Sequence, residues 1–251
     1  MDFDAKKPSH IFALVILVVA FAMVILLPIY SFFNAPLSID STQIEVASGL
    51  FRMIVEIIAL LIQILLVAIG IFIIVPFIWY FLVNKLSFKE ILFRIKLRKE
   101  GMDMAIFWGI VSMVSMFAIL FVIGIILTLY GVDLDESSNI ADLEQLFSLP
   151  SIFLIVAFQP IGEEIFFRGF LLDKINAMAG RETAIVLTSI LFGMAHLTYG
   201  NIYPAILTGI LGLILAYMVL KTKNLVTAIV AHIFFNVASV TLYIIGQSFM
   251  P

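Results

Sequence analysis

The chain has 251 residues, of which 63% are hydrophobic and only 12% are charged, and its formal net charge is −3. This charged fraction is too small to give a soluble domain its polar surface, so the composition indicates a protein solvated by a lipid bilayer. No basic patch interleaved with aromatic residues is present, which argues against a nucleic-acid partner. The absence of cysteine excludes disulfides, thiolate metal sites and a cysteine nucleophile.

Seven apolar segments follow one another along the chain, and each is long enough, or nearly so, to cross a bilayer. They run from about 11–33, 53–83, 104–130, 151–172, 183–199, 203–220 and 225–246. The first is too long for the core of a signal peptide, so we interpret it as a retained span. The second contains Pro76 and is expected to be one tilted or kinked helix. The sequence therefore predicts an all-α, polytopic bundle of about seven transmembrane helices, forming a single domain over residues 1–251.

The positions of lysine and arginine along the chain predict the orientation of the bundle. All of them except Arg52 and Arg168 fall in alternate segments between the spans, namely Lys6, Lys7, Lys85, Lys89, Arg94, Lys96, Arg98, Lys99, Lys174, Arg181, Lys221 and Lys223. The other connecting segments carry Asp40, Glu45, Asp133, Asp135, Glu136, Asp142 and Glu144. Because short cytoplasmic loops are rich in Lys and Arg, we expect the N-terminus inside and the C-terminus outside. The basic stretch 85–99 is expected to be an elbow on anionic headgroups rather than a regular surface helix.

Residues 162–169 read GEEIFFRG and place three charges inside the fourth apolar segment. Each charge at the centre of a spanning helix costs roughly 2.5 to 3.5 kcal/mol, so compensating contacts must exist. Glu164 and Arg168 are four residues apart and can form an ion pair on one helix face. Glu163 is rotated by about 100° and is expected to need a partner from another helix.

Two later segments carry polar residues that could meet this motif. The stretch FGMAH contains Phe192 and His196, and the stretch HIFFN contains His232 and Asn236. Polar side chains at membrane depth usually face the interior of the bundle. Counting along each helix places Glu163, both histidines and Asn236 in one layer between the cytoplasmic face and the midplane.

Such a cluster contains the groups needed to hydrolyse an amide bond. A buried carboxylate can take a proton from water, one imidazole can orient that water, and a second imidazole with an amide can stabilise the oxyanion. Ser151 and Ser189 lie too far along their helices to be favoured as nucleophiles. The set Glu163, His196 and His232 would equally suit a zinc ion with water in the fourth position, although no HExxH helix is present. The residues leave both alternatives open.

The pattern EExxxR at Glu163, Glu164 and Arg168, FxxxH at His196 and HxxxN at Asn236 resembles the CPBP family. That family contains the type II CAAX prenyl endopeptidases and the bacteriocin-processing or self-immunity proteins. The resemblance covers about residues 150–240, whereas the spans within 11–131 carry no matching motif.

The resemblance implies an intramembrane endopeptidase, glutamate-type or metal-dependent, that acts on a membrane-associated peptide or protein. It implies a bacterial cytoplasmic membrane and a site that faces the cytoplasm. Glu163 and His196 would activate water, and His232 and Asn236 would stabilise the oxyanion. Glu164 and Arg168 would hold the site or contact the substrate.

Two other functions fit the same residues: a catalytically idle membrane scaffold or regulator, and a proton-coupled transporter that uses the carboxylates and histidines as a relay. Glu164 and Arg168 could then serve the structure alone. Phe192 is expected to be core rather than site. Glu56 has no evident partner, and it is interpreted either as a helix-end residue near the outer interface or as part of a pathway. His10 is expected to be an exposed terminal residue.

Overall fold

The computed structural model describes residues 3–34, 49–131, 143–144, 146–198 and 200–249. These residues are almost entirely helical, and apart from an isolated bridge between Thr198 and Asn201 they form no β structure. Six helical runs are long and apolar enough to cross a membrane: Pro8–Phe33, Gly49–Leu82, Met102–Leu129, Leu149–Ala179, Tyr203–Thr222 and Val226–Phe249. The shorter helix α11 (Arg181–Met194) adds a further pass of about 21 Å. The prediction of an all-α membrane bundle of about seven helices is confirmed.

Several of the long runs consist of more than one helical element. The first contains α1 (Pro8–Phe21), η1 (Ala22–Leu26) and α2 (Leu27–Phe33), and the second contains α4 (Gly49–Leu61), η2 (Ile62–Ile74) and α5 (Val75–Leu82). The remaining elements are α6 (Phe88–Arg94), α7 (Met102–Leu129), α9 (Leu149–Glu164), η4 (Ile165–Leu171), α10 (Leu172–Ala179), α12 (Tyr203–Thr222) and α13 (Val226–Phe249). The elements η1, η2 and η4 are π-helical segments inserted in otherwise α-helical runs. The second apolar segment is one continuous helical run, as expected.

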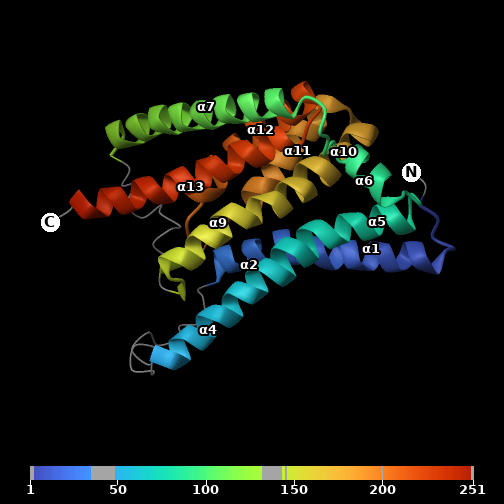
Figure 1. Cartoon of the computed structure of the whole chain (residues 1–251), viewed down its shortest axis with the longest axis horizontal. Helices are drawn as coiled ribbons and strands as arrows, with labels where there is room; N and C mark the ends of the chain where they lie inside the picture. Colours follow the sequence, from blue (N-terminus) through green and yellow to red (C-terminus); the bar gives the residue numbers. More distant parts are fainter. Residues whose placement is uncertain (1–2, 35–48, 132–142, 145, 199, 250–251) are drawn as a thin grey trace.

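Successive passes run in opposite directions, so the start of α1 and the end of α13 lie at opposite ends of the bundle (Figure 1). The run α9–η4–α10 lies at the centre, where α9 packs against α13 on one side and η2 on the other. Further pairs are α7 with α13, α11 with α12, and α1 with α5. The motif of the fourth segment therefore sits where three passes meet.

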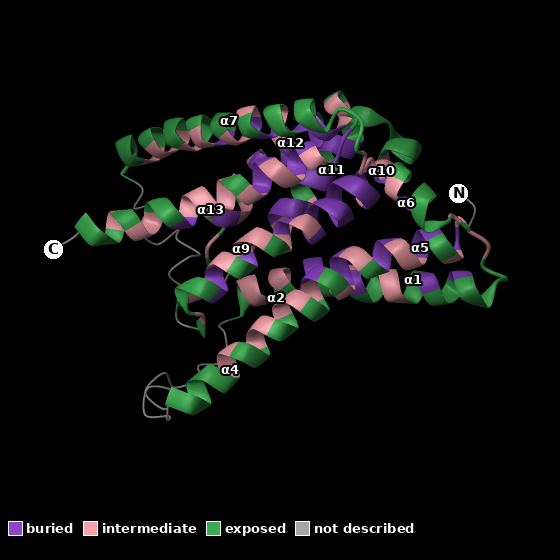
Figure 2. Cartoon of the chain, in the orientation of Figure 1, coloured by how far each residue is buried: buried purple, intermediate pink, exposed green. Residues whose placement is uncertain are grey.

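Burial follows this arrangement, because buried residues concentrate on η4, α11 and the facing parts of α12 and α13 (Figure 2). The four phenylalanines Phe166, Phe167, Phe170 and Phe192 are all at least 99% buried. Large apolar side chains cover the outside instead, as on the outward faces of α4 and α7. This inverted surface is what a lipid environment requires.

One end of the bundle collects the basic segments, and we call it the basic end, defined by residues 3–7, 83–101, 174–181 and 221–225. Its segments are tied together, since Leu225 N–H donates to the carbonyl of Lys96 over 2.8 Å and Arg94 pairs with Asp173 at 2.9 Å. All lysines and arginines except Arg52 and Arg168 belong to it. The structure thus brings the predicted inside charges to one end.

The elbow at this end is more regular than expected. Residues 88–94 form the short helix α6, whose start is capped by Ser87 and Glu90 in a reciprocal capping box. Hydrogen bonds from Ser87 hold the pKa of Glu90 below its usual value. At the opposite end, Tyr243 donates to Glu144 over 3.1 Å. The other acidic residues predicted outside, at positions 40, 45, 133, 135, 136 and 142, lie outside the described residues.

Two expectations about single residues are wrong. His10 was expected to be exposed, but only 1% of its surface is accessible. The chain before it folds back, and Nδ1 of His10 accepts a hydrogen bond of 2.9 Å from the N–H of Asp4. Glu56 does have partners, since it accepts bonds from the backbone N–H of Ser148 at 2.8 Å and the hydroxyl of Ser151 at 2.6 Å. Glu56 therefore joins the second pass to the start of α9.

Candidate active site

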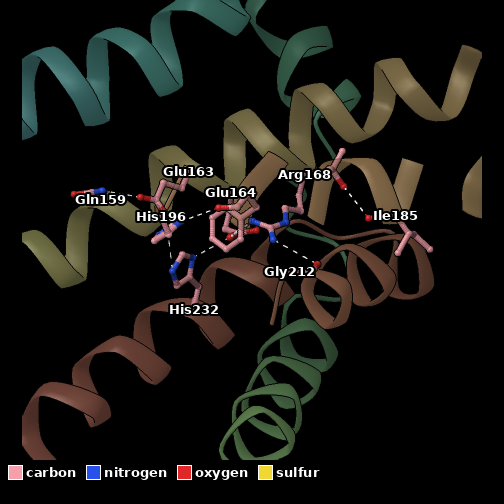
Figure 3. Close-up of polar contacts among 10 residues, drawn as sticks. Gln159, Glu163, Glu164, Arg168, Ile185, His196, Gly212 and His232 are labelled. Carbon is pink, nitrogen blue, oxygen red and sulfur yellow. Dashed lines mark hydrogen bonds and ion pairs between the residues drawn. The ribbon is translucent and has the colours of Figure 1, made fainter. Parts of the chain in front are cut away.

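The centre of the site is a fully buried ion pair on the α9–η4 run (Figure 3). Arg168 Nη1 lies 2.8 Å from Glu164 Oε1, and neither side chain is exposed. Arg168 Nη2 reaches the carbonyl of Gly212 at 3.4 Å, and its guanidinium lies 4.0 Å from the ring centroid of Phe192. The expected i, i+4 pair is present, and together with Gly212 and Phe192 it offsets part of the cost of burying Arg168, although Arg168 Nε and Glu164 Oε2 have no hydrogen-bond partner among the described residues.

His232 of α13 bridges both carboxylates of the motif. Its Nδ1 lies 2.9 Å from Glu164 Oε1, and its Nε2 lies 3.8 Å from Glu163 Oε2. An ionised carboxylate can only accept, so Nδ1 carries the proton toward Glu164. Neutral His232 would then present the lone pair of Nε2 toward Glu163 and the cavity.

His196 lies directly after α11 and is oriented by its own helix. Its Nδ1 donates to the carbonyl of Phe192 over 2.8 Å, because a carbonyl oxygen only accepts. In the neutral imidazole this leaves Nε2 as an acceptor. The Phe192 ring contacts both imidazoles, with centroid distances of 4.8 Å to His196 and 5.7 Å to His232. Phe192 is thus buried core, as expected, and also a wall of the site.

Glu163 has two neighbours that sequence reasoning missed. Gln159, one turn earlier on α9, donates to Glu163 Oε1 over 2.6 Å, so the expectation that Glu163 has no partner on its own helix is wrong. Gln63 of η2 in turn donates to the amide oxygen of Gln159. The sequence could have predicted these neighbours, because each glutamine is a polar residue within an apolar run and Gln159 stands four residues before Glu163.

A cavity of about 370 Å³ opens beside these groups. Glu163, His196, His232 and Asn236 all line it, and Asn236 stands one turn after His232 on α13. The structure therefore brings the four residues to one space, with Glu164 and Arg168 behind them.

The rest of the lining shows which way the cavity extends. It includes Leu143, Phe147 and Ser239, whereas no lining residue follows Glu163 on its run or precedes His232 on α13. Both of these directions lead to the basic end. The cavity thus extends from the cluster toward the opposite end of the bundle.

The serines near the cluster are engaged elsewhere. Ser189 donates to the carbonyl of Ile185 over 2.7 Å, and Ser151 donates to Glu56. Neither hydroxyl is paired with a histidine, which a serine nucleophile would need.

The described residues contain no group of three histidine, aspartate or glutamate side chains arranged to hold a metal ion. In the set considered for zinc, Nδ1 of each histidine is occupied, by Phe192 in one case and Glu164 in the other. Glu163 Oε1 is bonded to Gln159. These contacts leave Nε2 of both histidines and Oε2 of Glu163 as the atoms that would hold a zinc ion, because histidine ligands commonly donate their other ring N–H to a carbonyl or carboxylate. No step below is routed through a metal.

Fold and site together define an integral membrane protein with a buried glutamate–histidine–arginine cluster on an internal cavity. Residues 145–238 match the model of the family described as Type II CAAX prenyl endopeptidase Rce1-like. This match confirms, over residues 145–238, the resemblance suggested by the motifs. Comparisons with curated proteins and with solved structures gave no match.

Proposed function

We propose that the protein is an intramembrane endopeptidase that hydrolyses a peptide bond in a membrane-associated peptide or protein. The observation that carries this proposal is the meeting of Glu163, His196, His232 and Asn236 at one cavity, within the segment that matches a family of endopeptidases. No serine or cysteine nucleophile is required, because water can serve.

In the proposed reaction, a water molecule in the cavity lies between Glu163 and His196. Glu163 accepts a proton from the water while Nε2 of His196 accepts its second hydrogen bond and orients it. The water oxygen then bonds to the carbonyl carbon of the scissile peptide, and the carbonyl oxygen takes up negative charge.

The oxyanion is stabilised by the Asn236 amide together with His232, the roles that the resemblance implies. His232 can donate from Nε2 only when both ring nitrogens carry protons, and a carboxylate oxygen lies 2.9 Å from Nδ1 and another 3.8 Å from Nε2. Glu163 then returns its proton to the leaving nitrogen as the carbon–nitrogen bond breaks. The products are a new carboxylate and a new amine.

Glu164 and Arg168 are assigned a positioning role. Both are fully buried behind the cavity, and neither lines it. Through its contact with Nδ1, Glu164 fixes the tautomer and the ring orientation of His232. Arg168 compensates the charge of Glu164 and anchors it against Phe192.

For the orientation we propose that the basic end faces the cytoplasm, which places the N-terminus inside. Under this topology the cavity extends toward the opposite membrane face. This favours substrate entry from that face. The resemblance implies entry from the cytoplasm instead.

The proposal is tested with the full chain purified in lipid nanodiscs. A prenylated CAAX peptide, the same peptide without its prenyl group and a secreted-peptide leader are incubated with it, and the products are analysed by mass spectrometry. Cleavage that adds one water across one peptide bond supports the endopeptidase. If all three peptides stay intact and proteoliposomes containing the protein take up a peptide together with protons, the endopeptidase proposal is replaced by that of a transporter. Intact peptides without uptake would favour the scaffold.

A further inference from the structure

Three lysines at the basic end adopt a backbone conformation that disfavours any residue with a side chain. Lys85, Lys96 and Lys223 have φ angles of 54°, 63° and 55°, and they are the only described non-glycine residues with positive φ. Glycine would adopt this conformation without steric cost. The helix dipole stabilises a cation at the carboxyl end of a helix, which partly explains why lysine stands at these positions instead of glycine. Lys96 differs from the other two in what surrounds it.

Lys96 lines a hollow of about 490 Å³ on the elbow between the second and third long runs. The hollow is bordered by four cations, one carboxylate and two apolar side chains, namely Lys89, Arg94, Lys96, Arg98, Glu90, Leu86 and Phe93. Its position between two runs that can span a membrane places it at the level of the lipid headgroups. Positive charge predominates in this hollow.

Most of that charge is not compensated within the described part of the chain. Arg94 pairs with Asp173 at 2.9 Å, but Lys89, Lys96 and Arg98 form no ion pair with any described residue. Nε of Arg98 is buried without a hydrogen-bond partner among those residues. The carboxylate of Glu90 is directed at Ser87 instead, whose backbone N–H and hydroxyl donate to it at 2.8 and 2.7 Å.

The hollow is also preformed rather than dependent on loose side chains. The carbonyl of Lys96 accepts from Leu225 N–H, and Asn224 donates to the carbonyls of Arg98 at 3.2 Å and Glu100 at 3.3 Å. The Arg98 guanidinium stacks on the Phe93 ring at 4.0 Å. Partial burial lowers the pKa of Lys96 more than the nearby carboxylate of Asp173 raises it.

We propose that this hollow binds the phosphate of an anionic phospholipid headgroup. Lys96 and Arg98 would hold the phosphate oxygens, since guanidinium and ammonium groups are the usual ligands for phosphate in proteins. The exposed ring of Phe93 and the side chain of Leu86 would contact the first part of an acyl chain. A lipid rather than free phosphate is favoured because the hollow combines cations with apolar side chains at the membrane boundary.

The test compares lipids that differ only in headgroup charge. A short-chain phosphatidylglycerol and the matching phosphatidylcholine are titrated into the full chain in a neutral detergent, and bound lipid is counted by native mass spectrometry. We expect tighter binding of phosphatidylglycerol. Lys96→Gly and Arg98→Gln should each weaken that binding about fivefold.

Lys223→Gly is the matched control, because it removes a cation at the same end and from the same backbone conformation but outside the hollow. Glycine suits a φ of 63°, so Lys96→Gly should keep the thermal midpoint of the wild type, and lost binding cannot then reflect unfolding. Equal binding of the two lipids, or equal weakening by Lys223→Gly and Lys96→Gly, would overturn the proposal. Displacement of the lipid by equimolar inorganic phosphate would assign the hollow to free phosphate instead.

Discussion

Gln159 donates a hydrogen bond of 2.6 Å to Oε1 of Glu163, the residue one turn further along α9. The other oxygen, Oε2, lies 3.8 Å from Nε2 of His232. Gln159 is itself fixed, because its amide oxygen accepts a bond from Gln63 of η2. One oxygen of the carboxylate is therefore anchored, and the other faces the second imidazole.

This chain of contacts predicts a positioning role for both glutamines. Gln159→Leu should lower kcat at least tenfold with little change in KM, because a misplaced base affects the chemical step more than substrate binding. Gln63→Leu should have a smaller effect of the same kind. The measurement is initial cleavage rate against substrate concentration in purified variants of equal thermal midpoint.

A double variant separates a chain of contacts from two independent effects. If Gln63 acts only through Gln159, adding Gln63→Leu to Gln159→Leu should cost nothing further. If the reductions in kcat of the two single variants multiply in the double variant, or if only KM changes, the positioning role is contradicted.

Glu163 should be essential for cleavage and dispensable for folding. Glu163→Gln keeps size and hydrogen bonding but removes the base, so cleavage should disappear while expression stays near that of the wild type. Product formation and protein yield are measured on the same preparations. Retained cleavage in this variant would remove Glu163 from the proposed chemistry.

Glu164→Gln provides the contrast, because Arg168 would remain as a buried charge without its carboxylate. Stranding one member of a buried pair costs about 3–5 kcal/mol, so folding yield and activity should fall together. The thermal midpoint of the variant in detergent checks this. A Glu164→Gln variant of normal stability would show that the pair does not hold the bundle together.

Local sequence spacing was sufficient to predict much of the site. Apolar length specified the passes, and the four-residue spacing of Glu164 and Arg168 specified their ion pair, because both features depend on one helix. The three motifs meet at one cavity because polar side chains in an apolar chain have few other places to go.

What the sequence could not supply depends on how different helices pack. Gln63 lies 100 residues before Glu163, and its approach through Gln159 follows from the register of η2 against α9. The burial of His10 depends on the chain folding back from Asp4. The direction of the cavity required the relative heights of α9, α12 and α13, which apolar segments with uncertain ends do not define.

Gly162 should control the packing that brings Gln63 to Gln159. A Cβ at this position would lie 2.5 Å from the carbonyl oxygen of Ala68 in η2, and a backbone atom cannot easily move away. Gly162→Ala should therefore destabilise the protein by about 1–3 kcal/mol and reduce cleavage.

Gly246→Ala in α13 is its control, because a Cβ there meets nothing within 4 Å. That variant should match or slightly exceed the wild-type thermal midpoint, since alanine is the better helix former. Equal midpoints for the two alanine variants would contradict the close packing of α9 on η2.

Chelation should leave cleavage unchanged. The proposed reaction needs only water activated by Glu163 and His196, and the described residues contain no group of three histidine, aspartate or glutamate side chains arranged for a metal. The rate is compared before and after treatment with EDTA and with phenanthroline, followed by metal analysis of the protein. Loss of activity that Zn²⁺ restores would instead assign a zinc ion to Glu163, His196 and His232.

Single cysteines can test the orientation of the bundle and of its cavity, because the chain has no cysteine of its own. Lys223 marks the basic end, Tyr130 is 84% exposed just after α7 at the other end, and Ser239 lines the cavity. With the basic end in the cytoplasm, an impermeant maleimide added to intact cells should label Tyr130→Cys and Ser239→Cys. Lys223→Cys should react only after permeabilisation. Labelling of Lys223→Cys but not Tyr130→Cys would reverse the topology. Labelling of Tyr130→Cys alone from outside, with Ser239→Cys reacting only from inside, would place the cavity entrance at the cytoplasmic face.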